Sequence, residues 1–320
     1  MDKLQFKMQC EDTWDLLRTE FLWVYWAQVR ESPTSPAGNH QTWDGPFEGL
    51  SSAFLVHEGQ VDLKFGESVY SCFPGNWFFV EPGIRLQRIH PQTNILSIGY
   101  EAEWLTGKPL FNSLNLQDAK QANDRLYEIS KKLFHQLHGE NQVSVSFVEA
   151  MQKKKCSLQA HLRFRHVFQE WIASLVDRLE ALGAASTIIG STSPRSLRFI
   201  QILENISFST PLDKRHIENQ MQLSWRRLEQ IFIEAFEMSP NEFIQRRRFR
   251  EAKRLLKLRD TPIKEISYLL GFPQASSFSI WFKNQADKSP KAYREAISEL
   301  GPYIDGPISA DSDSKSMEAE

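Results

Sequence analysis

The chain has 320 residues, 41% of them hydrophobic, which is enough for two ordinary domains with real cores. Its formal net charge is −2, and no uninterrupted apolar run reaches the ~18 residues that span a membrane. Cys10, Cys72 and Cys156 are too scattered for a disulfide framework or a zinc cluster, and the N-terminus lacks a signal-type apolar stretch, so we expect a cytoplasmic protein with reduced thiols.

Residues 1–115 have the pattern of a small β domain. Aromatic and β-branched runs, one of them alternating with period two, predict four strands, at 21–29, 53–57, 61–65 and 76–80. Glu58-Gly59, Pro74-Gly75 and Pro82-Gly83 mark turns between them. Short strands separated by such turns are typical of a small barrel or sandwich.

Residues 116–183 change to a helical period, with one helix expected over 117–137 and a long amphipathic helix after it. Its apolar stripe comprises Phe164, Phe168, Trp171, Ile172, Leu175, Leu179 and Leu182. Two interpretations stay open at this point: the stripe packs on the β domain, or it forms the seam of a dimer.

The rest of the chain divides by composition. Residues 184–194 are small and polar, which indicates a linker, and residues 299–320 are polar and acidic, which predicts disorder. Between them, residues 195–298 are expected to form a helical domain. Its part from 195 to 295 carries 19 Lys and Arg against 12 Asp and Glu, so a polyanionic partner is indicated for this module, unless the charges are only solvated surface.

This helical module repeats itself. The segment 217–243 is echoed about fifty positions later by the segment 266–293. The corresponding pairs are Leu228 with Phe278, Phe232 with Phe282, Ser239-Pro240 with Ser289-Pro290, and Phe243 with Tyr293. A doubled two-helix unit with a charged outer face can read two neighbouring segments of one DNA groove.

The first copy offers base-reading side chains. Ser224 is placed to cap a helix that begins at Trp225. The face opposite its apolar residues presents Arg226, Glu229, Gln230 and Ile233, with Arg227 beside them. Arginine pairs with guanine, glutamine with adenine, and glutamate accepts from the cytosine amino group. The alternative is an exposed helix with solvated charges, and the repeat favours base reading.

The second copy has a weaker reading surface. Its outward residues are Ser276, Ser279, Ile280 and Lys283. Serine discriminates weakly, isoleucine can meet only a thymine methyl group, and lysine most naturally meets phosphate. The sequence therefore predicts unequal halves, with most discrimination in the first copy.

A helix rich in arginine connects the two copies. Ser239-Pro240-Asn241-Glu242 predicts a capping box with proline at the first helical position. The helix carries Arg246, Arg247, Arg248 and Arg250. At 1.5 Å per residue it is ~25 Å long, which suits two recognition helices about one DNA turn apart. Its arginines are expected to clamp phosphates, unless some are plain surface charges.

These motifs resemble the AraC/XylS family of bacterial transcription regulators. The matching positions are Arg248, Ala252, Leu255, Leu256, Ile263, Ile266, Gly271, Phe272, Ser276, Phe278, Phe282, Lys283, Ser289, Pro290, Tyr293 and Arg294. The departures include Gln222 and Asp287 where glycines are usual, and Ile280 in place of an arginine. The resemblance implies tandem helix-turn-helix units. It places base reading on Arg226, Glu229, Gln230, Ala275, Ser276, Ser279 and Ile280. Backbone contacts are expected at Arg227, Arg247, Arg248 and Lys283, and the resemblance gives Arg248 the greatest weight among the arginines of the connecting helix.

The N-terminal part is similar to the cupin-like sensor domains of such regulators, so the resemblance implies an α+β protein with a cupin-like β-barrel. His40, His57 and His90 lack the spacing of metal-binding cupins, so neither a metal nor another cofactor is expected. Large aromatic residues could line an apolar ligand pocket or simply form the core: Trp23, Trp26, Phe54, Trp77 and Phe79.

Two functions follow from these observations. The favoured one is a sequence-specific regulator that binds double-stranded DNA, performs no chemistry, and responds to a small molecule or to homodimerisation through its N-terminal domain. RNA polymerase is a partner if the regulator is an activator. The alternative is a cupin-type enzyme with a DNA-binding appendage, although no nucleophile motif and no phosphate-binding glycine loop supports it.

Overall fold

The structure is a computed structural model. It describes residues 16–29, 43–111, 114–120, 124–141, 143–145, 156–187, 192–256 and 261–299. Cys10, His40 and the tail beyond 299, for which disorder was expected, lie outside the described residues.

The chain forms two compact units, and each draws on separate stretches of sequence. The sheet unit comprises Phe21–Tyr100, Leu114–Leu182 and Glu299–Glu320. The helical unit comprises Met1–Glu20, Glu101–Ser113 and Gly183–Ser298. The division therefore differs from the consecutive domains expected from composition, because Glu101–Ser113 belongs with the helices that follow much later in the chain.

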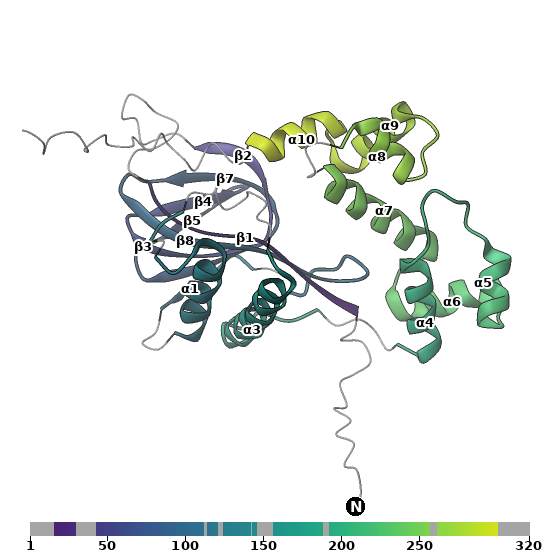
Figure 1. The fold of residues 1–320 in the computed structure, drawn as a ribbon, viewed down its shortest axis with the longest axis horizontal. Helices are drawn as coiled ribbons and strands as arrows, with labels where there is room; N and C mark the ends of the chain where they lie inside the picture. The colour runs from purple at the N-terminus through teal and green to yellow at the C-terminus, as the bar shows by residue number, and fades with distance from the viewer. Residues whose placement is uncertain are drawn as a thin grey trace, which may run out of the picture. The chain divides into compact units, whose positions relative to one another are not determined.

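In the described part of the chain, nine strands make two sheets (Figure 1). They are β1 Leu17–Val29, β2 Asp44–Gly49, β3 Ser52–Glu58, β4 Val61–Phe65, β5 Ser68–Cys72, β6 Asn76–Val80, β7 Gly83–Ile89, β8 Thr93–Trp104 and β9 Leu116–Ala119. One sheet has the order β1-β8-β3-β6-β9 and the other has the order β2-β7-β4-β5. All four strands predicted from the sequence are present, and Gly59 and Gly75 take positive φ in the predicted turns.

The main core lies between the two sheets. Side chains alternate across a strand, so every second residue of each strand points inward. The inward set is Trp23, Tyr25, Ala27, Phe54, Val56, Val61, Leu63, Cys72, Phe78, Val80, Ile89 and Ile95. Within the described strands, no ladder joins the two sheets into the closed barrel that was expected.

In its described part, the sheet unit also contains two helices, α1 Arg125–His138 and α3 Leu158–Ala181. Trp171 of α3 donates a hydrogen bond to Ser130 of α1 at 2.9 Å, and Phe21 of β1 meets Phe164 edge to face at 4.7 Å. The apolar stripe of α3 is buried from Phe168 to Leu179. This part of the stripe therefore packs within the unit.

The helix predicted over 117–137 begins later than expected. Residues 116–119 pair with β6 as strand β9, and α1 starts only after Asp124, whose side chain accepts from the Tyr127 amide. Helical propensity in this segment is overridden because β6 offers an edge whose backbone groups can be paired.

The helical unit contains seven helices in its described part (Figure 1). They are α4 Pro194–Glu204, α5 Lys214–Met221, α6 Trp225–Phe236, α7 Pro240–Leu256, α8 Ile263–Leu269, α9 Ala275–Ala286 and α10 Pro290–Glu299. The fold is thus α+β, as the sequence predicted. No helix in the described ranges is both long and apolar enough to cross a membrane.

Candidate nucleic-acid interface

The sequence repeat is a structural repeat. Helices α5 and α6 form the first helix-turn-helix copy, and α8 and α9 form the second. All three pairs of equivalent apolar residues are buried: Leu228 and Phe278, Phe232 and Phe282, Phe243 and Tyr293. The equivalence extends to the backbone, since Glu237 and Asp287 end their helices with φ of 56° and 55°. Each recognition helix therefore rests on an equivalent core.

Each copy has a residue in the left-handed conformation in the turn between its two helices, and the two copies use different residues there. Gln222 ends α5 in the left-handed conformation at φ 53°, where glycine is usual. Gly271 has φ 78° in the second turn, and a Cβ there would lie 1.9 Å from the carbonyl oxygen of Phe208. Glycine is therefore required in the second turn by close approach as well as by conformation.

Helix α6 presents the predicted reading face. The Ser224 side chain accepts from the Arg227 amide, which confirms the predicted cap. Arg226, Gln230 and Ile233 are exposed, while Glu229 is half-buried. Three polar side chains able to read base edges thus lie within two turns of one helix.

Hydrogen bonds hold part of this face in place. Arg227 Nη1 donates to Gln230 Oε1 at 2.8 Å, and Gln230 Nε2 donates to Glu234 Oε1 at 3.0 Å. The Gln230 amide therefore has a defined orientation, with its oxygen toward Arg227. Glu234 was not among the sequence-predicted site residues, although its four-residue spacing from Gln230 on a helix was the available signal.

Helix α9 presents a poorer surface. Ser279 Oγ donates to the Ala275 carbonyl at 2.8 Å, so its hydroxyl proton is already used within the helix. Ser276 is exposed, Ala275 is half-buried, and Ile280 is 65% exposed. Lys283 is exposed at the end of the same helix. The face thus has one cation and few groups that distinguish bases.

Helix α7 connects the copies, and its start forms half of the predicted capping box. Ser239 Oγ accepts from the Glu242 amide at 3.1 Å. The Glu242 carboxylate pairs instead with Arg246 at 2.7 Å, four residues along the helix. The reciprocal bond to the cap is thereby replaced by an ion pair on the helix surface.

The arginines of α7 have partners inside the helical unit. Glu204 at the end of α4 accepts from Arg250 Nη2 at 3.3 Å and lies 3.7 Å from Arg247 Nε. Arg18 also pairs with Glu204. Arg250 Nη1 donates to the Leu105 carbonyl at 3.2 Å. Glu204 was missed by the sequence reasoning, because no local pattern links it to helix α7.

Arg247 and Arg248 pack on a phenylalanine that the sequence did not single out. The guanidinium of Arg247 lies 4.2 Å from the Phe208 ring centroid, and that of Arg248 lies 5.4 Å from it. Arg248 is also 5.5 Å from the Phe272 ring. Burial lowers the pKa of both arginines, and Glu204 opposes this shift at Arg247. Both predicted phosphate contacts are therefore half-buried in the protein itself.

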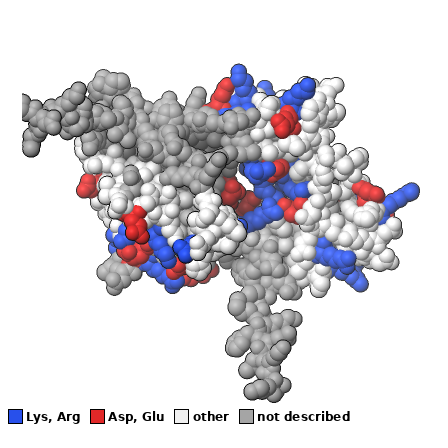
Figure 2. All heavy atoms as spheres, in the orientation of Figure 1, with Lys and Arg blue, Asp and Glu red and all other residues white. Residues whose placement is uncertain are grey.

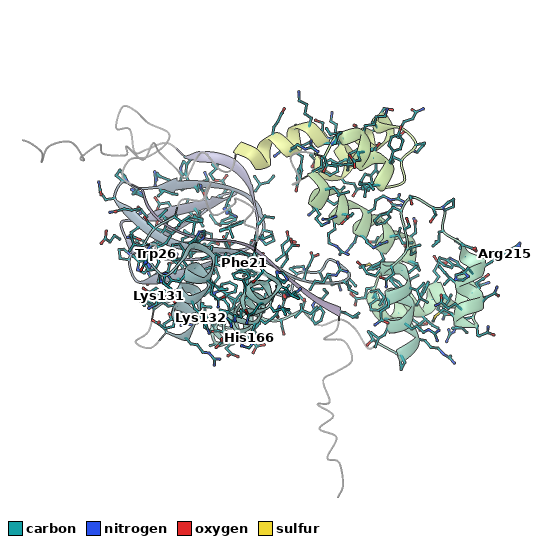
Figure 3. The ribbon with its side chains drawn as sticks, in the orientation of Figure 1. Phe21, Trp26, Lys131, Lys132, His166 and Arg215 are labelled. Carbon is teal, nitrogen blue, oxygen red and sulfur yellow. The ribbon has the colours of Figure 1, made fainter. Side chains whose placement is uncertain are left out.

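On the face seen in Figure 2, positive charge lies in separate groups over the helical unit. Figure 2 shows blue and red atoms interleaved on it, with white surface between them. On α5, Lys214 stacks over the Trp225 ring at 4.6 Å, and the exposed Arg215 points away from its helix (Figure 3). Any binding of DNA here therefore depends on individual cations placed around the reading helices.

The five aromatic residues expected to line a ligand pocket lie on two faces of one sheet. Trp23 and Phe54 face the core between the sheets. Trp77 and Phe79 stack on each other on the opposite face, where Trp77 donates to Asp124 at the start of α1. Trp26 (Figure 3) stacks on His57 at 4.8 Å and meets Phe134 of α1. The structure thus does not bring all five together.

The histidines are also dispersed. Burial, followed by the charge of Lys120, lowers the pKa of His57 to about 4. His90 Nε2 lies 2.8 Å from the buried Asp62 carboxylate, and hydrogen bonds including that from His90 lower the pKa of Asp62 to about 2 against the opposing effect of burial. In the described part of the chain, no group of three or more His, Cys, Asp and Glu residues is arranged to hold a metal ion.

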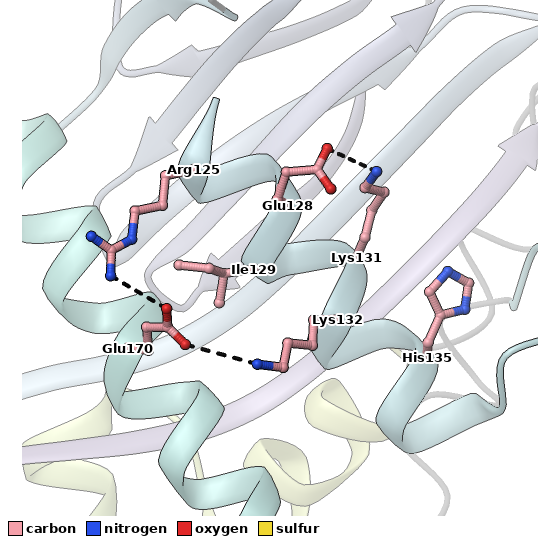
Figure 4. Close-up of a pocket in the computed structure, with 7 residues that line it drawn as sticks. All are labelled: Arg125, Glu128, Ile129, Lys131, Lys132, His135 and Glu170. Carbon is pink, nitrogen blue, oxygen red and sulfur yellow. Dashed lines mark hydrogen bonds and ion pairs between the residues drawn. The ribbon is translucent and has the colours of Figure 1, made fainter. Parts of the chain in front are cut away.

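A groove of about 560 Å³ lies between α1 and α3 (Figure 4). Glu170 faces Arg125 at 3.3 Å and Lys132 at 4.0 Å, and Glu128 pairs with Lys131 at 2.8 Å. The charges of this groove therefore largely compensate one another, and the groove lies apart from the recognition helices in sequence and unit.

Comparisons with known proteins agree with the C-terminal architecture. Residues 217–296 match the family model of a helix-turn-helix domain. The chain is 24% identical over 123 residues to an uncharacterized HTH-type transcriptional regulator, YijO of Escherichia coli K12, covering 38% of this chain and 44% of that protein. It is 22% identical over 161 residues to the HTH-type transcriptional activator RhaS of Escherichia coli O9:H4 strain HS, covering 42% of this chain and 58% of that protein.

The chain therefore spans about half the length of the curated relatives that it matches. Among solved structures, it is similar to ToxT from Vibrio cholerae O395, with 15% identity, 89% of this chain and 99% of that chain covered, and a TM-score of 0.38. A transcriptional regulator with an AraC-type DNA-binding domain from Chromobacterium violaceum matches with 23% identity, 34% and 96% coverage, and a TM-score of 0.31. The domain match and the relatives confirm the resemblance to AraC/XylS regulators for the C-terminal module.

Proposed function

We propose that this protein is a sequence-specific DNA-binding transcription regulator. The observation that carries the proposal is the exposed face of α6, where Arg226, Glu229 and Gln230 stand on a buried core that recurs in the second copy. Two such helices in successive major-groove segments would read one side of a duplex.

Base reading is proposed for Arg226, Glu229 and Gln230, with a lesser share for Ala275, Ser276, Ser279 and Ile280. Phosphate contacts are proposed first for Lys283 and Arg227, because both are exposed. Arg247 and Arg248 would contribute less, since Phe208 and Glu204 already engage these side chains.

We further propose that the sheet unit responds to a small molecule or mediates homodimerisation, and that RNA polymerase is a partner if transcription is activated. The proposed location is the cytoplasm. No catalysis is proposed, since the relatives are transcriptional regulators and the sequence has no recognised catalytic motif. The cupin-type enzyme stays the alternative, and stoichiometric iron, zinc or manganese on purified protein would favour it.

The test is selection of DNA fragments by the full chain from a genomic library at moderate salt, followed by competition with random DNA. We expect enrichment of a small set of fragments, and a large loss of that enrichment for Arg226→Ala combined with Gln230→Ala. The matched control is Arg163→Ala, an exposed cation on α3 of the sheet unit. Binding that prefers no fragment over random competitor would refute the proposal.

A further inference from the structure

A single arginine points into the space between the two sheets. On β7, Ile89 pairs with Val61 and Gln87 pairs with Leu63. Ile89, Val61 and Leu63 belong to the core between the sheets, so this face of β7 points inward. Since side chains alternate along a strand, Arg85 shares this inner face. Its neighbour Ile84 is 72% exposed, as expected for the opposite face.

The guanidinium of Arg85 has no partner for its buried atoms. Nε and Nη1 are buried, and neither makes a hydrogen bond within the described part of the chain. Burial lowers the pKa of Arg85 to about 10, with a smaller opposing effect from Tyr25, so the group is charged at neutral pH. A buried charge without a partner is costly, so such a group calls for a counter-ion.

Arg88 lies three residues further along β7, and its guanidinium has hydrogen-bond partners. Its Nε and Nη2 donate to Asp62 Oδ2 at 2.9 and 2.7 Å, and its guanidinium lies 4.7 Å from the Trp43 ring centroid. Both arginines belong to β7, but among the described residues a carboxylate contacts only Arg88.

Arg85 lies beside the terminal strands of both sheets. Strand β7 adjoins β2, the terminal strand of its sheet, and the neighbouring Tyr25 lies on β1, the terminal strand of the other sheet. Arg85 is only partly buried as a whole residue, which leaves an approach from solvent. Leu50, which directly follows β2, is a partly buried apolar residue packed against the core.

We propose that this margin of the sheet unit is a ligand site, at which Arg85 binds the carboxylate of a small organic acid whose apolar body lies against Tyr25 and Leu50. A guanidinium presents two parallel N–H donors that match the two oxygens of a carboxylate. One cation among aromatic and aliphatic side chains suits a monoanion with an apolar body. This inference deepens the proposed function, because it gives the effector of the sheet unit a chemical class.

The experiment compares Arg85→Met with Arg88→Met in the full chain by thermal unfolding. Without ligand, we expect Arg85→Met to raise the unfolding midpoint by a few degrees, because an unpartnered buried charge is replaced by a side chain of similar shape. Arg88→Met should lower the midpoint, because it removes two hydrogen bonds and a positive charge from the buried Asp62 carboxylate. A merely structural Arg85 would behave as Arg88 does.

The second arm adds phenylacetate or hexanoate at millimolar concentration, with 2-phenylethanol and hexan-1-ol as their neutral counterparts. Both acids should raise the midpoint of the wild type and of Arg88→Met, but not that of Arg85→Met, and the alcohols should shift none. Arg85→Lys keeps the charge without the paired donors, so it should retain a smaller shift.

Three results would overturn the inference: a lower midpoint for ligand-free Arg85→Met, no shift of the wild type by either acid, or equal shifts in the wild type and Arg85→Met. None of these measurements involves DNA. A failure here therefore leaves the proposed DNA reading intact, and a failure of fragment selection leaves the carboxylate site intact.

Discussion

Helices α6 and α9 occupy equivalent places in two copies of one motif, yet they expose different chemistry. Inward, Leu228 and Phe232 of α6 match Phe278 and Phe282 of α9, and all four are buried. Outward, α6 carries two arginines, a glutamate and a glutamine, whereas α9 offers two serines, an isoleucine and a lysine. Burial thus constrains one face of each helix, while the other face is free to specialise.

The largest expected effect is on stability, and it concerns the buried cores that are equivalent in the two copies. Phe232→Ala and Phe282→Ala should each lower the free energy of unfolding by about 3–5 kcal/mol, since both rings are fully buried and each would leave a cavity. Denaturant titration of the full chain measures this. Ile280→Ala on the exposed face is the control and should cost less than about 0.5 kcal/mol. A small cost for only one phenylalanine would mean that the two cores are unequal.

The second largest effect is expected in the turns, where substitution should change the stability of the two copies by different amounts. Gly271→Ala is expected to cost at least ~2 kcal/mol, because it combines a positive φ with a Cβ that meets a backbone oxygen. Gln222→Gly should change stability by less than ~1 kcal/mol, because relief of the left-handed strain offsets the entropy of an added glycine. Thermal unfolding of both variants measures the difference, and equal effects would contradict the packing seen at Gly271.

DNA discrimination should be unequal as well. Arg226→Ala is expected to relax specificity by about 1–3 kcal/mol at one base position, whereas Ser279→Ala should change it by less than about 0.5 kcal/mol. Binding to a set of single-base variants of a selected fragment measures this. If both substitutions cost the same specificity, the asymmetry between the copies is wrong.

The smallest expected effect is on salt dependence. Lys283→Ala should weaken binding to all sequences alike and reduce the slope of log K against log salt by about 1. Arg247→Ala should reduce the slope less and lower the unfolding midpoint more, because Arg247 already contacts Glu204 and Phe208. Affinity titrations at several salt concentrations distinguish the two. Equal slopes for both variants would show that Arg247 is released from the protein on binding.

Local patterns predicted much of the helical unit. The apolar positions of both copies, the Ser224 cap and the start of α7 followed from helical spacing and capping chemistry. In the sheet unit, strand runs and Pro-Gly turns indicated β3, β4 and β6. These features depend on residues within a few positions of one another, so the sequence carries them directly.

Long-range partners could not be predicted in this way. Glu204 and Arg250 are 46 residues apart, and nothing in either neighbourhood indicates their ion pair. Residues 116–119 became a strand because β6 presents an open edge to them, not because of their own pattern. Whether Trp23 and Trp77 face one pocket depends on which side of the sheet each occupies, and the strand register decides that.

The loop that contains Phe208 limits which parts of the helical unit can change in the course of evolution. Its carbonyl abuts Gly271, and its ring contacts Arg247 and Arg248 of α7, so the segment between α4 and α5 braces both α7 and the turn of the second copy. Surface residues of α6 can be exchanged without disturbing this brace, which would let the preferred bases drift. The spacing between the two proposed recognition helices is harder to alter, because lengthening or rotating α7 would break the brace as well.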